Sequence, residues 1–361
     1  MPGEMPTAND LRAELRALPK IDLHRHLEGS LRLQTLAEIA QEHGIDLPGY
    51  AIEDLRPFAT VTDEEPDFQR FLEKFKFLRH FYTSREAVER MTYEAVADAA
   101  ADNVKYLELR FNPVALARVQ GFSLEAVTSW VCDAIEKAQG DRDIRANLIV
   151  QIGRDETLET AFKLARVAVT YRDSGVVGLD LAGDEQRYPA SPFEGVFRQA
   201  RREGLHVTVH AGEAGDPKNI EEAITRLEAE RIGHGVRSIE NPSVLRLLRD
   251  RNVALEICPT SNIQTGVVRH FWHHPLPNLI ALKIRLSINT DDPSLTDTTL
   301  TDEYWVAMQA MGVSLDQIKQ TIVTAAEVSF QTPEERALLA DWFRKKLNVS
   351  NNGRTPADRR E

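Results

Sequence analysis

The stretch Ile21-Asp22-Leu23-His24-Arg25-His26 places two histidines, one residue apart, at the end of a short apolar run. Alternate side chains of a β-strand point to the same face, so we expect His24 and His26 to project together from a strand end. Two neutral imidazoles held in this way form half of a divalent metal site. The pair alone is equally compatible with a structural role, so its meaning depends on what the rest of the chain supplies.

Short strand-like runs alternate with longer helix-like stretches along the whole chain. Such alternation is typical of parallel strands joined by crossover helices. Eight units favour an α/β fold of the closed (β/α)8 barrel type over an open doubly wound sheet, which is the structural alternative. The predicted strands are 20–23, 104–111, 145–152, 176–181, 206–210, 231–233, 253–257 and 285–289. The predicted helices include 31–43, 84–101, 124–138, 158–172, 192–202, 220–228 and 242–251.

The predicted barrel carries additions at two places. Residues 31–101 hold extra helices between the first two strands, and helices over 315–327 and 333–346 close the domain. We predict a single domain over 1–349 and a disordered tail over 350–361, where polar residues, Gly and Pro predominate.

One part of the first addition, residues 68–78, has apolar side chains at 68, 71, 72, 75 and 78. This spacing predicts a helix with an apolar stripe. Core packing is the favoured interpretation of the stripe, and an apolar lid over the barrel mouth is the alternative.

The composition argues against several classes of protein. The 361 residues are 42% hydrophobic and 28% charged, which is ordinary for a globular protein. A net charge of −12 argues against a nucleic-acid backbone or an anionic membrane as the main partner. No apolar run predicts a transmembrane helix or a signal peptide. The two cysteines, Cys132 and Cys258, predict no disulfide framework. We expect a cytoplasmic protein, and the sequence does not indicate its oligomeric state.

Polar side chains follow six of the predicted strands, and in such barrels the working residues stand at the carboxyl ends of strands. Three imidazoles and one carboxylate suit zinc, with a further position left for water. We predict one zinc ion bound by His24, His26, His210 and Asp291. A single metal is favoured because no lysine that could bridge two metals follows strand 176–181. Six other histidines are left out of the predicted metal site: His43, His80, His206, His270, His273 and His274.

Four further strand-end positions supply acid–base and hydrogen-bonding groups. Glu213 and His234 are the predicted acid–base groups, because a histidine near a metal-activated water can take its proton. Asp292 can exchange one more hydrogen bond, and Gly183 lets its backbone N–H approach a flat ligand closely. Three of the four have a structural alternative: His234 as a turn residue, Glu213 as a helix cap and Asp292 as an N-cap. The structural alternatives would have to hold at several strand ends at once, so the combined pattern favours a functional site.

Six motifs, in order along nearly the whole chain, resemble those of the adenosine deaminase family. They are Leu23-His24-Arg25-His26-Leu27-Glu28-Gly29-Ser30, Asp180-Leu-Ala-Gly-Asp-Glu185, His210-Ala-Gly-Glu213, Arg231-Ile-Gly-His-Gly235, Cys258-Pro-Thr-Ser-Asn262 and Asn289-Thr-Asp-Asp-Pro293. The resemblance implies a metal-dependent (β/α)8 barrel of the amidohydrolase superfamily. It also implies hydrolysis of the 6-amino group of adenosine or 2′-deoxyadenosine, which yields inosine or 2′-deoxyinosine and ammonia.

The resemblance implies a role for each matching residue. The zinc ligands would be His24, His26, His210 and Asp291. Glu213 would protonate ring N1, and His234 would help to deprotonate or orient the water that attacks C6. The substrate contacts would come from His26, Glu28, Gly183 and Asp292, with Glu28 at the ribose 5′-hydroxyl, the Gly183 N–H at N3 and Asp292 at N7. The helix around Phe71 would correspond to an apolar gate near the sugar.

One position departs from the family pattern, because typical adenosine deaminases have aspartate where this chain has Glu28. Relatives that act on free adenine or on 5′-modified adenosines often vary here. Deamination of adenine, methylthioadenosine or aminodeoxyfutalosine is therefore the alternative function, although the motifs at 258–262 and 290–299 resemble those of the nucleoside enzymes. A non-catalytic nucleoside-binding protein fits less well because no ligand or proton donor is missing. A hydrolase of amides or phosphotriesters is disfavoured by the Gly183 and Glu213 motifs.

Overall fold

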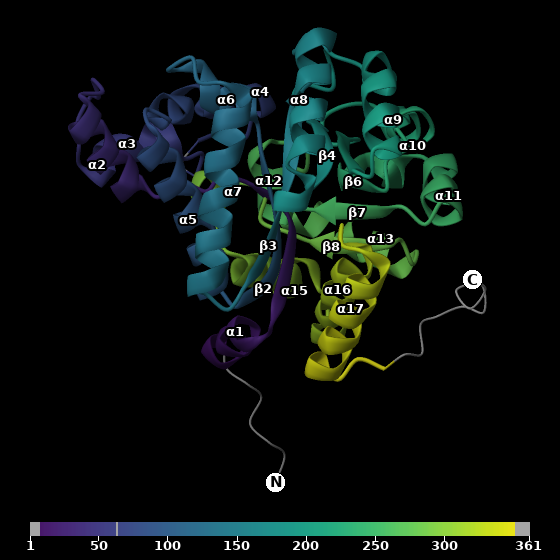
Figure 1. Ribbon diagram of the computed structural model, residues 1–361. Helices are drawn as coiled ribbons and strands as arrows, with labels where there is room; N and C mark the ends of the chain where they lie inside the picture. Colours follow the sequence, from purple (N-terminus) through teal and green to yellow (C-terminus); the bar gives the residue numbers. More distant parts are fainter. Residues whose placement is uncertain (1–7, 63, 351–361) are drawn as a thin grey trace.

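The computed structural model describes residues 8–62 and 64–350, and in this part of the chain eight parallel strands form one sheet in the order β1 to β8 (Figure 1). The two edge strands also meet, because the backbone of Asp291 exchanges hydrogen bonds with His24 and His26, each 2.8 Å long. The sheet thus forms a nearly closed barrel, and the predicted (β/α)8 fold is confirmed.

The strands and helices of the described residues alternate around this barrel. The strands are β1 (Lys20–His26), β2 (Val104–Phe111), β3 (Arg145–Gly153), β4 (Val176–Ala182), β5 (His206–Ala211), β6 (Arg231–His234), β7 (Ala254–Ile257) and β8 (Leu286–Ile288). The helices are α1 (Ala8–Ala17), α2 (Leu33–His43), α3 (Ile52–Ala59), α4 (Phe68–Leu78), α5 (Arg85–Ala101), α6 (Pro113–Arg118), α7 (Leu124–Asp141), α8 (Leu158–Thr170), α9 (Glu194–Arg202), α10 (Lys218–Arg226), α11 (Pro242–Asp250), α12 (Pro259–Gln264), α13 (Leu276–Ala281), α14 (Pro293–Thr296), α15 (Leu300–Met311), α16 (Leu315–Val328) and α17 (Pro333–Leu347). Short 3-10 turns are η1 (Arg79–Phe81), η2 (Arg172–Ser174), η3 (Ser191–Phe193), η4 (Val236–Glu240) and η5 (Phe271–His273).

Several strands extend further toward their carboxyl ends than the sequence pattern predicts. The predicted first strand ends at residue 23, but β1 continues to His26, and β6 includes His234. These polar residues read as loop in the sequence, yet their backbones pair with neighbouring strands. Helices α1 and α15 were also not predicted. The tail predicted over 350–361 lies, apart from residue 350, outside the described residues.

The centre of the barrel contains a buried ionic network instead of an all-apolar core. Arg231 Nε donates to Glu256 Oε1 at 2.6 Å, and Arg231 Nη2 donates to Glu108. Arg110 Nη2 donates to Glu256 Oε2 at 2.8 Å, and its Nη1 donates to Asp180 Oδ2 at 3.2 Å. All five side chains are fully or almost fully buried. Each charge therefore faces an opposite charge, which offsets the cost of removing it from water.

The segment after α16 packs against the end of this network. The ring of Phe330 lies 3.5 Å from the Arg231 guanidinium, and the backbone N–H of Phe330 donates to Glu108. The imidazole ring of His206 also stacks on the Phe330 ring, with the two ring centroids 4.7 Å apart. The Nδ1 atom of His206 lies 3.0 Å from Glu230 Oε1. His206 thus has structural partners, in agreement with its exclusion from the metal site. Helices α16 and α17 pack side by side next to this segment (Figure 1).

Two composition-based expectations can be compared with the described residues. Cys132 and Cys258 are buried and unpaired, as expected for a chain without a disulfide framework. Within residues 8–62 and 64–350, no helix has both the length and the apolar character needed to cross a membrane.

Candidate active site

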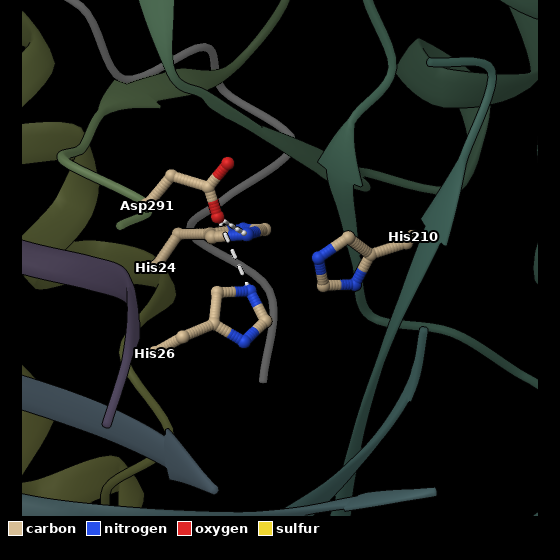
Figure 2. A group of neighbouring side chains, drawn as sticks. All are labelled: His24, His26, His210 and Asp291. Carbon is tan, nitrogen blue, oxygen red and sulfur yellow. Dashed lines mark ion pairs between the residues drawn. The ribbon is translucent and has the colours of Figure 1, made fainter. Parts of the chain in front are cut away.

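Four side chains from three strand ends converge at one point of the barrel (Figure 2). His24 and His26 come from β1, His210 comes from β5, and Asp291 follows β8. One ligand atom of each residue lies within 4.8 Å of the other three. Asp291 Oδ1 lies 3.1 Å from His24 Nε2 and 3.2 Å from His26 Nε2. The structure therefore brings the four predicted metal ligands together in a buried cluster.

The donor atoms of this cluster fit a divalent metal. His24 Nδ1 lies 2.8 Å from Glu256 Oε2, and His210 Nδ1 lies 3.0 Å from Asp180 Oδ1. Because an ionised carboxylate can only accept, each Nδ1 carries the hydrogen and each Nε2 keeps its lone pair. His24 Nε2 is buried and has no hydrogen-bond partner, although Asp291 Oδ1 is close to it. A metal ion would satisfy this buried lone pair.

The local charges keep these groups in the forms that bind metal. Burial lowers the pKa of His210 to about 4, so its imidazole is neutral near pH 7. Burial alone would raise the pKa of Asp180, but His210 and Arg110 hold it below its ordinary value. The pKa of Glu256 is likewise held well below its ordinary value because Arg110 and Arg231 outweigh the effect of burial. The two carboxylates that orient the histidines are therefore ionised.

Glu213 and His234 lie beside the metal-ligand cluster. His234 Nε2 is 3.7 Å from Glu213 Oε2 and 3.8 Å from Asp291 Oδ2. Burial raises the pKa of the Glu213 carboxyl well above its ordinary value, and the nearby Asp291 raises it further. The raised pKa favours the protonated form of Glu213, which can donate a hydrogen bond or a proton to a ligand.

The loop that presents Glu213 is organised by Glu185, to which the sequence analysis assigned no role. The Glu185 carboxylate accepts hydrogen bonds from the backbone N–H groups of Gly212 at 2.9 Å, Glu213 at 2.7 Å and Gly215 at 2.8 Å. Helix α10 begins only at Lys218, and no side chain caps its amino end, which removes the helix-cap alternative for Glu213.

The backbone of two site residues adopts an uncommon conformation. His234 has a φ of 57° and Asp291 a φ of 64°, both in the left-handed region that non-glycine residues rarely occupy. The turn alternative for His234 is thus correct for its backbone, but its side chain is buried against the ligand cluster. Such strained positions concentrate at functional sites.

A cavity of about 350 Å³ opens next to the ligand cluster, a volume suited to a small molecule. Eight of the nine predicted site residues line it: His26, Glu28, Gly183, His210, Glu213, His234, Asp291 and Asp292. The ninth, His24, is fully buried. The cavity is thus built where the sequence analysis places the site.

The apolar stripe of α4 forms one wall of this cavity. Phe68, Phe71, Leu72 and Phe75 all line it, and only Phe71 among these four is buried. The favoured interpretation of core packing is confirmed for Phe71 and Leu78, which belong to the buried core, and for Phe75, which packs against it. The half-buried Phe68 and Leu72 line the cavity without belonging to that core, and the alternative of a lid stays a prediction.

Polar atoms without partners mark two other walls of the cavity. Glu28 Oε1 accepts from the backbone N–H of Asn112 at 3.0 Å, but Glu28 Oε2 and Gln151 Oε1 are buried without a partner. Asp292 Oδ1 is also buried without a partner. Asp292 precedes α14 but its side chain makes no capping bond, which removes the N-cap alternative. A ligand with polar groups can satisfy these atoms.

Two glycines have a clear steric role in the site. A Cβ at Gly29 would lie 1.8 Å from Asp292 Oδ1, so only glycine allows Asp292 to pack there. Gly183 has a φ of 109°, a conformation that strains any side chain. The close approach predicted for the Gly183 N–H rests on its missing Cβ and stays a prediction, whereas its positive φ and the packing of Asp292 against Gly29 are visible only in the structure.

Sequence reasoning did not identify the residues behind the ligands. Asp180 and Glu256 lie in apolar strand segments, and this is the signal that could have identified them. A charged residue inside a buried strand requires a partner, and near predicted metal ligands that partner is a histidine.

The sequence matches the family model described as "Adenosine deaminase" over residues 19–346. An adenosine deaminase of Klebsiella pneumoniae is 38% identical over 323 residues, which cover 90% of this chain and 97% of that protein. The crystal structure of an adenine deaminase from Arthrobacter aurescens has a TM-score of 0.85 at 28% identity and covers 92% of this chain and 100% of that chain. An amidohydrolase from Burkholderia ambifaria with bound Zn has a TM-score of 0.82 at 26% identity, covering 97% of each chain.

Proposed function

This chain belongs to the adenosine deaminase family, and we propose that it hydrolyses the 6-amino group of adenosine and 2′-deoxyadenosine, releasing inosine or 2′-deoxyinosine and ammonia. The observation that carries the proposal is the placement of Glu213, a buried carboxyl with a raised pKa, beside three histidines and Asp291 at a cavity of about 350 Å³. Metal-assisted hydrolysis with protonation of the substrate requires this combination of groups.

We assign one zinc ion to His24, His26, His210 and Asp291. The nitrogen-rich ligand set and the Zn-bound relative at 26% identity support this choice of metal. When bound, zinc lowers the pKa of a water molecule toward about 7 and so supplies the nucleophile at neutral pH.

Glu213 has the role of proton donor to ring N1 of the purine. A proton on N1 draws electron density from C6, which makes C6 a better target for the attacking water. The raised pKa of Glu213 favours the protonated form that this role requires, and the negative charge left after transfer lies close to His234. The bond from C6 to the amino nitrogen then breaks and ammonia leaves. The attacking water supplies the oxygen that stays on C6; one of its hydrogens ends on the ammonia, and the other replaces the proton that Glu213 gave to N1.

Asp292 and Gly183 orient the purine ring in this proposal. Burial raises the pKa of Asp292 well above its ordinary value, and the charge of Asp291 raises it further. A protonated Asp292 can donate a hydrogen bond to N7, which is an acceptor in adenine. The backbone N–H of Gly183, at the cavity wall, can donate to N3. Both contacts hold C6 toward the ligand cluster.

Glu28 contacts the sugar in this proposal. Its Oε2 is buried at the cavity without a partner and can accept a hydrogen bond from the 5′-hydroxyl of a nucleoside. The longer carboxylate of Glu28 and the adenine deaminase among the similar structures keep free adenine as the second candidate substrate. Sites with buried polar groups discriminate strongly between ligands that do and do not satisfy them.

The test is a comparison of kcat/KM for zinc-loaded protein on adenosine, 2′-deoxyadenosine, adenine, methylthioadenosine and an aminofutalosine, with ammonia release as the readout. We expect the highest values for the two nucleosides, loss of activity with a chelator and recovery when zinc is added back. A preference for adenine or a 5′-modified nucleoside would overturn the substrate assignment but not the reaction. Absence of turnover on the whole panel by zinc-loaded protein would overturn both.

A further inference from the structure

Two buried polar side chains, Asn262 and His274, continue a hydrogen-bonded chain from His234 on the side away from Glu213. The Nδ2 atom of Asn262, in α12, lies 3.1 Å from His234 Nδ1. The Oδ1 atom of Asn262 lies 3.3 Å from Nε2 of His274, the residue that precedes Pro275 and α13. His274 Nδ1 accepts a hydrogen bond from the backbone N–H of Leu276 at 3.1 Å. All three side chains are buried.

The backbone N–H at Leu276 determines the direction of every hydrogen bond in this chain. It can only donate, so His274 Nδ1 must carry a lone pair. A neutral imidazole has one hydrogen, which therefore lies on His274 Nε2 and is donated to Asn262 Oδ1. The amide NH2 of Asn262 is then left to donate to His234 Nδ1.

The opposite orientation of the Asn262 amide is excluded by the same contacts. A flipped amide would place its NH2 group against the N–H of His274, so that two donors would face each other. A doubly protonated His274 is excluded because its Nδ1 already accepts a hydrogen bond. Burial also lowers the pKa of His274 to about 3, which keeps the ring neutral.

We propose that Asn262 and His274 are positioning residues that hold His234 in the tautomer with its hydrogen on Nε2. His234 then presents an N–H donor toward Glu213 and Asp291, whose carboxylate oxygens lie 3.7 and 3.8 Å from this nitrogen. In this tautomer His234 Nε2 cannot accept a proton from the attacking water. It instead donates a hydrogen bond that orients the oxygen of that water toward C6.

This inference rests on the proposed deaminase function for its catalytic consequence, whereas the tautomer itself is a property of the protein. It selects one of the two roles that the family resemblance leaves open for His234, which are removing a proton from the water and orienting the water. The lone pair of His234 faces Asn262 and is thus shielded from the reaction by two other side chains.

The direct test is long-range 1H–15N correlation NMR of zinc-loaded protein labelled with 15N-histidine, with the His234 signals assigned from a His234→Gln variant. We expect an unprotonated Nδ1 and a protonated Nε2 on His234 in the wild type. A protonated Nδ1 in the wild-type spectrum would overturn the proposal. This measurement requires neither turnover nor a folded variant at Asn262 or His274.

Two substitutions test the roles of Asn262 and His274. Asn262→Asp keeps the shape but can only accept, so His234 is expected to gain a hydrogen on Nδ1. His274→Phe removes the group that orients the amide, so both tautomers of His234 are expected. The matched controls are Asn278→Asp and His273→Phe, which change exposed residues near the same segment and leave the His234 signals in place. Retention of the wild-type tautomer in folded, zinc-loaded Asn262→Asp protein would contradict the proposal.

Kinetics on the best purine substrate provide a second readout. We expect kcat to fall by about 10- to 100-fold in Asn262→Asp and in His274→Phe, the loss typical for residues that orient a site group, with little change in KM. A change in KM without a change in kcat would contradict the positioning role. If the wild type deaminates no purine, the proposed function fails, while the NMR result still decides the tautomer.

Discussion

The interior of the barrel and the cavity at its carboxyl end bury charged groups in opposite ways. In the interior, Arg231 contacts both Glu108 and Glu256, and no carboxylate of that group is left without a cation. At the cavity, Glu28 Oε2 and Asp292 Oδ1 are buried without a hydrogen-bond partner. The two regions contain similar residue types but treat their charges differently.

This difference separates structural charges from functional ones. Burial of a charge is costly unless a partner compensates it, and the interior network meets that condition. At the cavity, burial raises the pKa values of Glu28, Glu213 and Asp292, which shifts these three carboxyl groups toward the uncharged, protonated form. A protonated carboxyl can donate to a ligand, so the uncompensated region is the one suited to chemistry.

The largest expected effect comes from removing the proton that Glu213 holds at the cavity. Glu213→Gln keeps the size of the side chain but cannot transfer a proton, so kcat is expected to fall by about 10²- to 10⁴-fold. Zinc content and the free energy of unfolding should stay near the wild-type values. Steady-state kinetics, metal analysis and urea unfolding check these outcomes, and a near-normal kcat would show that another group protonates N1.

A substitution in the interior network is expected to lower the stability of the protein, whereas the substitution at Glu213 lowers its activity. Arg231→Met leaves Glu108 and Glu256 facing each other without their shared cation, so the free energy of unfolding should fall by about 3–5 kcal/mol. Urea unfolding measures the loss. Arg85→Met is the matched control, because Arg85 forms ion pairs at the surface and should change stability little. Equal effects of the two substitutions would contradict the view that the interior charges are structural.

Glu303 is a buried carboxyl outside the cavity that has no cationic partner among the described residues, and we expect it to affect stability but not activity. It accepts a hydrogen bond from Thr260 at 3.0 Å, its Oε1 has no partner, and burial raises its pKa from 4.5 to about 8. The folded state therefore binds a proton that the unfolded state has lost between these values. The resulting stability is complete below pH 4.5 and is lost as the pH rises through about 8.

The corresponding measurement is urea unfolding of wild-type and Glu303→Gln protein from pH 5 to 9. The variant should lack the decrease in stability that Glu303 causes, so the difference between the two curves should change steadily with pH. Parallel curves would show that Glu303 does not titrate in this range. The ranking of purine substrates should be the same in both proteins.

The smallest expected effect is a change of specificity at Glu28. Glu28→Asp shortens the side chain that lies at the cavity beside Asn112, so the contact with a sugar hydroxyl moves. We expect the ratio of kcat/KM values between adenosine and adenine to change more than kcat on the better substrate. An unchanged ratio would show that Glu28 does not select the sugar and that the polar atoms of this wall serve another purpose.

The prediction of the barrel succeeded, and the four candidate metal ligands lie together, for one geometric reason. The carboxyl ends of parallel strands meet at one end of a barrel, so residues such as His24, His210 and Asp291 become neighbours once the strand order is known. The positions of these residues at the ends of predicted strands were thus sufficient to predict that they lie together.

The prediction was less complete where side chains from different elements share one space. The α4 stripe indicated a helix, but whether Phe68 and Phe75 face a core or a cavity depends on how far the helix extends past the barrel. The partners of the ligands, Asp180 and Glu256, were not identified because a single charged residue in a strand does not indicate which group it will meet.

By itself, the sequence determined the eight-strand barrel and the family, and it predicted the four residues that the structure gathers as a possible metal site, because strand periodicity and motif order are local properties of the chain. The tertiary structure alone decided the upward shift in the pKa of Glu213 and the direction of the hydrogen bonds behind His234. Both depend on burial and on partners distant in the chain, such as Asp291 and His274, since a pKa or a tautomer is set by the surroundings of a group and not by its identity.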